Sequence, residues 1–264
     1  MSEFATEVLG ENDPEQTEKE AGKVAGVTEI EEGAPWNAVE DAFLRRRSIR
    51  KFKKKQVPAH LIRRMLEVGR FAPSQGNCQP WKMVVVRDRD MIEEMEDFCV
   101  ASCRKIAGMV DYTVYDKGTF ARRKTEMMAK LISRSKPNSM HPVPFAAVSL
   151  VAQNRFAVFH HPPTIILPLM DTRGIGHPQI DLGIVGTNIV MAAHSLGLGT
   201  CWVGLASFLN ESPEWRERLE VEEPYEIIEA ISVGYPLGKP MRNTVSRETH
   251  ETVWLEDGKK ELIY

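Results

Sequence analysis

The 264-residue sequence lacks a long hydrophobic run. Its longest apolar stretch, residues 164–170, is interrupted by Pro168 and is far shorter than the roughly 20 residues that a membrane-spanning helix needs. Residues 1–33 also lack the basic start and the apolar stretch of a secretory signal. The usual sequence signs of membrane insertion and export are therefore missing, and we expect a cytoplasmic protein.

Cysteine is scarce, and the four cysteines contain no C-x-x-C pair. Cys99 and Cys103 lie one helical turn apart, but the other two cysteines have no cysteine near them in the sequence. The cysteine spacing therefore does not supply a set of ligands for zinc. We expect reduced thiols that are buried or half-buried. His160 and His161 are adjacent, and side chains next to each other on an extended segment point to opposite faces. We therefore expect no bound metal.

An excess of either charge is missing too. The 34 basic and 37 acidic residues give a net charge of −3, and this small acidic excess disfavours nucleic acid or an anionic membrane as the main partner. The length allows one sizeable hydrophobic core. Residues 1–34, rich in Glu, Gly, Thr and Lys, are predicted to be a flexible tail. A globular domain is predicted over residues 35–264.

Hydrophobic spacing predicts an alternation of helices and strands. Helices are expected from Pro35, from Pro58, over 91–107, 120–134 and 180–196, and after the capping residue Ser212. Buried strands are expected over 81–86 and 164–170, with further strands over 201–203 and 225–235. In the helix over 120–134, the apolar contacts are expected to be Met127, Met128, Leu131 and Ile132.

The helix over 180–196 is apolar on more than one face, so we expect it to be buried nearly all round. Gly197 and Gly199 are expected to end it. Strands separated by helices predict a mixed α/β or α+β layer fold.

The basic run Arg46-Arg47-Ser48-Ile49-Arg50 follows the first predicted helix. In an extended turn, alternation puts Arg46, Ser48 and Arg50 on one side. Two guanidinium groups and a hydroxyl on one side suit a ligand that bears a phosphate. A solvated basic face at a helix end explains the same residues, so this motif alone leaves both interpretations open.

Two further segments could approach a ligand. Residues 72–81, A-P-S-Q-G-N-C-Q-P-W, form a loop whose backbone N–H groups and amides can bind the polar edge of a heterocycle, although a plain connector has the same composition. Residues 197–204, G-L-G-T-C-W-V-G, put two glycines before a strand, where the backbone can lie close to a ligand; a simple helix stop is the alternative. These glycines follow a helix, unlike the phosphate-binding glycines of a dinucleotide fold.

Taken in order, R-R-S-I-R-K-F, A-P-S-Q-G-N-C-Q-P-W, G-L-G-T-C-W-V-G and I-S-V-G-Y-P resemble the motifs of the nitroreductase superfamily, over about residues 36–254. The resemblance implies an α+β fold with a central, mostly antiparallel sheet flanked by helices. It implies an intertwined homodimer with FMN at the subunit interface and NADH or NADPH as the reductant. Residues 100–160 exceed what a minimal family member has, and we interpret them as an insertion that forms a lid.

The resemblance also implies roles for residues by their position. The implied contacts with the FMN phosphate and ribityl chain are Arg46, Arg47, Ser48 and Arg50, and those from the other subunit are Pro73, Ser74, Gln75 and Asn77. The implied contacts near the isoalloxazine ring are Trp202, Val203 and Gly204. Near the C-terminus, the implied phosphate ligand is Arg247, and Lys239 and Arg242 are the alternatives for this role.

No catalytic side chain is implied, because the flavin itself performs hydride chemistry. The implied activity is NAD(P)H-dependent reduction of a small electron-poor acceptor, such as a nitroaromatic compound or a quinone. A flavin-dependent dehydrogenase or ene-reductase of a specific metabolite, and a non-enzymatic flavin-binding protein, are the alternatives.

Overall fold

The computed structural model describes residues 33–135, 142–238, 247 and 250–262. The helices are α3 (Ala38–Arg45), α4 (Ala59–Arg70), α5 (Arg89–Val110), α6 (Phe120–Ser135), α7 (Pro142–Ala152), α8 (Pro178–Ser195) and α9 (Pro213–Arg218), with 3-10 helices η1 (Gln75–Asn77), η2 (Tyr112–Val114) and η4 (Gly204–Glu211). The strands are β1 (Trp81–Val86), β2 (Thr164–Asp171), β3 (Gly199–Val203), β4 (Tyr225–Ile227), β5 (Ala230–Gly234), β6 (Val253–Glu256) and β7 (Lys259–Leu262). The predicted tail lies almost wholly outside the described residues.

Two compact units divide the chain, one ending at Asp41 and the other beginning at Ala42. The first unit contains the start of α3, where the Asn37 side chain accepts hydrogen bonds from Val39 N at 2.9 Å and Glu40 N at 3.0 Å. This N-cap starts the helix at Ala38, three residues after the predicted proline.

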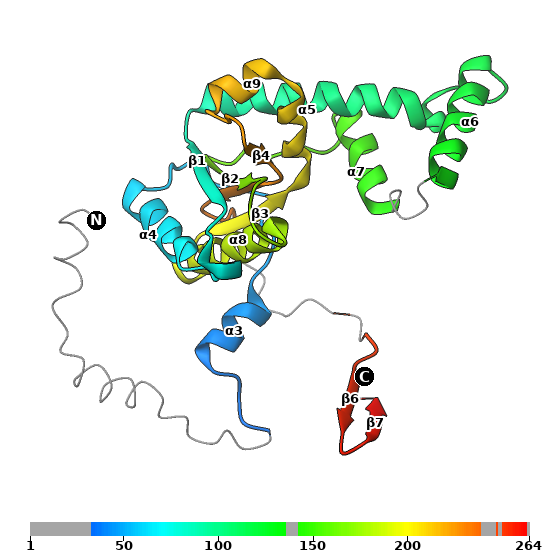
Figure 1. Ribbon diagram of the computed structural model, residues 1–264. Helices are drawn as coiled ribbons and strands as arrows, with labels where there is room; N and C mark the ends of the chain where they lie inside the picture. The colour runs from blue at the N-terminus through cyan, green and yellow to red at the C-terminus, as the bar shows by residue number, and fades with distance from the viewer. Residues whose placement is uncertain (1–32, 136–141, 239–246, 248–249, 263–264) are drawn as a thin grey trace, which may run out of the picture. The chain divides into compact units, whose positions relative to one another are not determined.

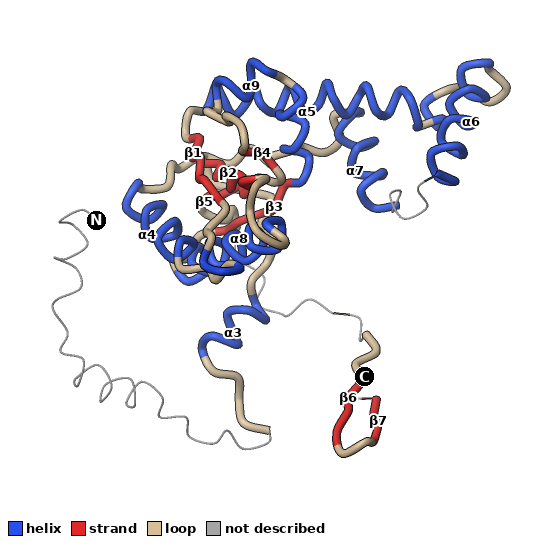
Figure 2. The backbone as a smooth tube through the Cα atoms, viewed as in Figure 1, coloured by secondary structure: helices blue, strands red, loops and turns tan. Residues whose placement is uncertain are grey.

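A five-stranded antiparallel sheet organises the second unit (Figure 2). The central strand β2 pairs with β1 along one side, while β5 and β4 share its other side and β3 lies beyond β5. The predicted antiparallel sheet is therefore confirmed. The single strand predicted over 225–235 is wrong, because it consists of β4 and β5. The prediction that β1 is a buried strand is also wrong, since β1 lies at an edge of the sheet and is mostly half-buried.

Helices cover both faces of this sheet (Figure 1). Side chains alternate along β2, so Ile166 faces one side and Ile165 and Leu167 face the other. On the Ile166 side, α4 and α8 supply the buried residues Ile62, Met65, Val185 and Ile189. On the opposite side, α5, η4 and α9 supply Met95, Cys99, Leu209 and Trp215. The result is a helix–sheet–helix sandwich with one core on each side of the sheet.

Nine of the eighteen residues of helix α8 are buried, so the helix is not covered all round. Its Val185 side faces the sheet, whereas Ile180 is 60% exposed and Gly183 and Thr187 are also exposed. The prediction of burial nearly all round is therefore wrong for the single chain. Among the described helices, none is both long and apolar enough to cross a membrane.

The end of α8 follows the prediction at one glycine and departs from it at the other. Gly197 has a φ of +73°, and Leu198 N donates to Ala193 O at 2.9 Å, as in a glycine-terminated helix. Gly199, in contrast, is the first residue of β3. A Cβ at Gly199 would lie 2.7 Å from the Ile49 side chain, so this glycine allows a close approach.

Residues 100–160 contain the second half of α5 together with α6 and α7, which lie beside it (Figure 1). The Asp111 carboxylate joins α5 to α7, because it accepts hydrogen bonds from Thr113 and from Ser149. The prediction of apolar contacts in α6 is wrong for Met127, Leu131 and Met128, which are 63%, 60% and 37% exposed. The side chain of Ile132 lies outside the described part of the chain. The lid stays a prediction.

Strands β6 and β7 form a hairpin that hydrophobic spacing did not predict. Asp257 and Gly258 at its turn have φ values of +50° and +72°. An Asp-Gly pair with two positive φ values is the usual two-residue hairpin turn, so the dipeptide was the available signal.

Candidate functional site

The arginine segment, residues 46–50, is attached to the start of β3. Ser48 forms a parallel bridge with Thr200, and Ile49 N donates to Thr200 O at 2.8 Å. The Ile49 side chain also packs against Gly199, at the place where another residue would carry its Cβ. The basic run is therefore part of the folded sheet edge, with its side chains held at defined places.

Arg46 and Arg50 lie on the same side of this segment, close to the Cys201 thiol. Burial raises the pKa of that thiol, and the neighbouring guanidinium groups of Arg50 and Arg46 offset part of the rise. Neither arginine forms an ion pair with a carboxylate of the described residues. Together with the exposed Ser48, they form a cationic cluster that suits a phosphate.

Arg47 turns away from this cluster. Its Nη1 donates to Leu44 O at 3.4 Å and to Arg46 O at 3.3 Å. Its Nη2 is buried and finds no hydrogen-bond partner in the part of the chain that the structure describes. The alternation along the segment thus separates Arg47 from Arg46 and Arg50, and a phosphate contact from Arg47 stays a prediction.

His160 lies beside Arg50, a position that the sequence did not indicate. The side chain is 8% exposed, and the Phe156 ring meets it edge-on at 5.0 Å between centroids. Burial, reinforced by the charges of Arg50 and His161, lowers the pKa of His160 to about 4. The imidazole is therefore neutral at neutral pH. In the described residues, no three metal-ligating side chains lie close enough to hold an ion.

Acid should destabilise the fold through His160. Its pKa is about 4 in the folded chain and about 6.5 when unfolded, so the unfolded chain binds more protons between these values. The free energy of unfolding should therefore fall as the pH is lowered from 6.5 to 4. Urea unfolding across this range should show a smaller fall for His160→Asn than for the unaltered chain. Identical pH slopes would contradict the assignment.

The cysteines follow the prediction with one exception. All four are free thiols, of which Cys99, Cys103 and Cys201 are buried. Burial raises the pKa of Cys103 to about 11, so this thiol stays protonated. Cys78, in contrast, is exposed in the loop after α4, and the prediction of a buried or half-buried thiol is wrong there.

The loop over residues 73–79 is held by its own hydrogen bonds. Ser74 Oγ accepts from Gln79 N at 2.9 Å, and Asn77 N donates to Ser74 O at 3.0 Å. Pro73, Gln75 and Asn77 remain exposed, and the loop borders a hollow. The residues that line this hollow are Arg70, Phe71, Ala72, Pro73, Asn77 and Gln79.

Asp181, in the first turn of α8, anchors this loop. Its Oδ1 accepts a long hydrogen bond of 3.4 Å from Gln75 N. Its Oδ2 is buried, and the described residues offer it no hydrogen-bond donor. A Cβ at Gly176 would lie 1.6 Å from Gln75 Oε1, so that glycine makes room for the Gln75 amide. The sequence offered no signal for Asp181 beyond its place at a helix start.

The residues predicted to lie near the isoalloxazine ring, Trp202, Val203 and Gly204, have different surroundings. The Trp202 ring packs on α8, where a Cβ at Gly186 would lie 1.9 Å from it, and Val203 is buried in the core. Gly204 is exposed, so its backbone is open to a ligand. Glu229, whose Oε1 lies near Gly204, has its pKa raised by burial and was not indicated by the sequence.

Helix α8 separates the arginine segment from the loop in a single chain. The segment lies beside the start of β3, which follows the C-terminal end of α8, whereas the loop is bound to Asp181 at the N-terminal end. The helix from Asp181 to Ser195 is about 20 Å long at 1.5 Å per residue. Arg247 is exposed, and Lys239 and Arg242 lie outside the described residues.

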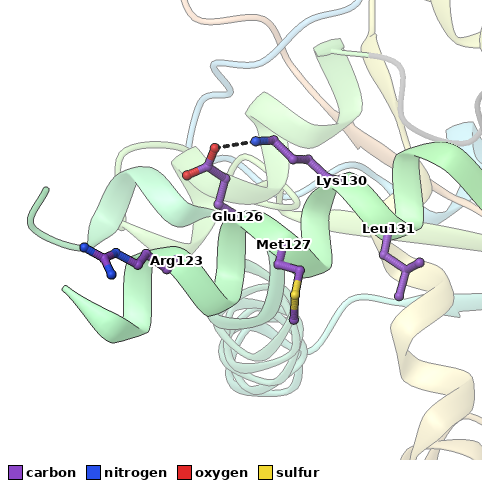
Figure 3. A pocket seen from close by; sticks show the side chains of 5 residues that line it. All are labelled: Arg123, Glu126, Met127, Lys130 and Leu131. Carbon is purple, nitrogen blue, oxygen red and sulfur yellow. Dashed lines mark hydrogen bonds and ion pairs between the residues drawn. The ribbon is translucent and has the colours of Figure 1, made fainter. Parts of the chain in front are cut away.

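A second hollow lies on α6 (Figure 3). It is lined by Arg123, Glu126, Met127, Lys130 and Leu131. Lys130 and Glu126 form an exposed ion pair at 2.7 Å, a contact that contributes little to stability. The hollow belongs to one helix face, and none of its residues was predicted to bind a ligand.

Comparison with known proteins identifies the fold and the family. The model of the Nitroreductase family matches residues 44–235. The 4-nitrobenzoate reductase of Nocardioides sp. is 29% identical over 202 residues, which are 74% of this chain and 79% of the relative.

Two solved structures share the fold. The nitroreductase with bound FMN from Desulfitobacterium hafniense has a TM-score of 0.58 and 20% identity, covering 84% of this chain and all of that one. The FMN-dependent nitroreductase NfnB from Mycobacterium smegmatis, in complex with NADPH, has a TM-score of 0.51 and 22% identity, covering 75% and 87%.

Proposed function

This chain belongs to the nitroreductase family, and we propose on that premise that it uses FMN and NAD(P)H to reduce small electron-poor acceptors, such as nitroaromatics or quinones. The observation that carries the proposal is the cluster of Arg46, Arg50 and Ser48 at the start of β3, which has no carboxylate partner in the described chain. The phosphate of FMN carries nearly two negative charges, and charge-assisted hydrogen bonds from two arginines match it.

The residues present fit a flavin mononucleotide. Arg46, Ser48 and Arg50 would hold the phosphate, with Arg247 as a further cation, and the exposed backbone at Gly204 would face the ring. When bound, FMN supplies the group that accepts hydride from NAD(P)H and passes it on. The names of the relatives, including a 4-nitrobenzoate reductase and an NADPH complex, support the reductant and the acceptor class.

A homodimer completes the proposed site. The loop with Pro73, Gln75 and Asn77 is exposed, yet α8 keeps it away from the arginine segment of its own chain. In the proposed dimer, this loop of one copy faces the arginine segment of the other. The exposed side of α8, with Ile180 and Gly183, supports this arrangement, because an apolar stripe on a long helix suits a partner surface.

The purified protein should be yellow or take up added FMN. Under anaerobic conditions, NADH or NADPH should bleach the flavin absorbance, and nitrofurazone or menadione should then restore it with turnover. A colourless protein that takes up no FMN would overturn the proposal. A flavin that is reduced but transfers electrons to neither acceptor would favour a dehydrogenase or ene-reductase, and a flavin that neither nucleotide reduces would favour a binding protein.

A further inference from the structure

Two buried polar atoms of opposite charge lack partners in the described chain: Nη2 of Arg47 and Oδ2 of Asp181. Asp181 is only 6% exposed. Burying a charged group without a partner destabilises the fold, so both groups call for a counter-charge. Their existing contacts are long: 3.3 and 3.4 Å for Arg47 and 3.4 Å for Asp181. Since both atoms are buried in the single chain, a contact with a second copy requires each side chain to turn away from these long contacts toward the surface.

The two groups belong to opposite ends of α8. Asp181 is in the first turn of the helix, whereas the neighbour of Arg47, Ser48, pairs with Thr200 just beyond the last turn. The helix between these points is about 20 Å long. An arginine side chain cannot span that length, so Arg47 and Asp181 of the same chain cannot neutralise each other.

The exposed stripe of α8 shows how a second copy could bring them together. Ile180, Gly183, Ile184, Thr187 and Met191 recur at helical spacing, and a Cβ at Gly183 would meet nothing within 4 Å. Thr187 lies close to the midpoint between the two ends of the helix. A two-fold axis near this midpoint packs α8 antiparallel against its copy.

In that arrangement, the N-terminal end of one α8 lies beside the C-terminal end of the other. We propose that Arg47 of one copy pairs with Asp181 of the partner subunit, twice in each dimer, and that these pairs set the register of the two copies. This inference rests on the dimer of the proposed function. It makes Arg47 a positioning residue. Asp181 contacts the loop over residues 73–79 of its own chain, so the pair would hold that loop of the partner subunit beside the Arg46–Arg50 cluster of the first copy.

Two charge-reversed chains test the pairing. Arg47→Asp alone puts two carboxylates at each contact, and Asp181→Arg alone puts two guanidinium groups there. A mixture of the two chains, however, forms a mixed dimer in which both contacts join opposite charges. We expect each variant alone to dimerise at least about 100-fold more weakly than the unaltered chain, and the mixture to form almost entirely mixed dimers. Native mass spectrometry and sedimentation of flavin-free protein measure both quantities.

Lys105→Asp, at an exposed position of α5, is the matched control. When it is mixed with the unaltered chain, the dimers should follow a statistical 1:2:1 distribution. The same distribution for the Arg47→Asp and Asp181→Arg mixture, or dimers of either variant as tight as the unaltered chain, would overturn the ion pair. A purely structural role of the two residues would weaken both variants without favouring the mixed dimer.

Neutral variants keep the test decisive if a charge-reversed chain does not fold. Arg47→Gln and Asp181→Asn should each raise the dissociation constant of the dimer. In the double variant, the increase in this constant should be at least about tenfold smaller than the product of the two single increases. Additive effects would overturn the pair. Since these measurements need no flavin, a chain that dimerises through this pair but takes up no FMN would refute the proposed function alone. A monomeric chain that still reduces acceptors with FMN would refute this inference.

Discussion

Changing both Arg46 and Arg50 to alanine should give a folded protein that purifies without flavin. Each guanidinium group should contribute about 1.5–3 kcal/mol through hydrogen bonds to a charged phosphate. Losing both should weaken FMN binding by roughly 10²–10⁴-fold. Fluorescence titration of flavin-free protein with FMN measures the dissociation constant directly.

Lys51→Ala is the matched control, because Lys51 follows the same segment and its side chain is exposed. This variant should keep nearly normal FMN affinity. Arg50→Lys should retain part of the affinity, since it keeps the charge but loses the two-pronged geometry of the guanidinium. If the double alanine variant binds FMN as tightly as the unaltered protein, the phosphate lies elsewhere, with Arg247 the first described alternative.

Gly186→Ala should be the most damaging small substitution in α8. The new Cβ would lie 1.9 Å from Cη2 of Trp202, a rigid, half-buried ring that packs against the core between α8 and the sheet. Overpacking of this kind costs about 1–3 kcal/mol, and the short distance favours the upper end. For a domain of this size, the melting temperature should fall by roughly 5–10 °C in differential scanning calorimetry.

Gly108→Ala provides the matched control in α5. A Cβ at Gly108 would meet nothing within 4 Å, so this change should leave the melting temperature unaltered or raise it slightly through better helix propensity. Combining Gly186→Ala with Trp202→Leu should recover part of the lost stability, because the smaller side chain makes room. Equal melting temperatures for Gly186→Ala and Gly108→Ala would show that the ring moves aside without cost.

Local patterns predicted the elements that have strong internal signals. The helix after Pro58, the strand over 164–170 and the cap at Ser212 lie where expected, since each is specified by hydrophobic spacing or by a capping residue within a few positions. The hairpin at Asp257-Gly258 was missed for lack of hydrophobic alternation: β6 and β7 are exposed along their whole length.

The predicted site could be specified only as a set of segments. The order of motifs indicated the family, and the alternation in Arg46, Ser48 and Arg50 correctly grouped the two arginines. Nothing near Arg50 in the sequence indicated His160, because more than a hundred residues separate them and only the packing of the sheet brings them together. For the same reason, the Gln75–Asp181 contact could not be foreseen.

The sequence by itself determined the helices and strands with strong local signals, the end of α8 at a glycine, and the family to which the chain belongs. These properties depend on residues that are close along the chain or on motifs in a fixed order. Only the tertiary structure decided that Trp202 packs on α8, that Gly199 begins β3 instead of ending α8, and that one side of α8 stays uncovered. The spacing of hydrophobic residues in the sequence shows how apolar one face of a helix is. Which neighbour covers that face depends on contacts between distant residues, and for α8 we propose that the neighbour is a second copy of the chain.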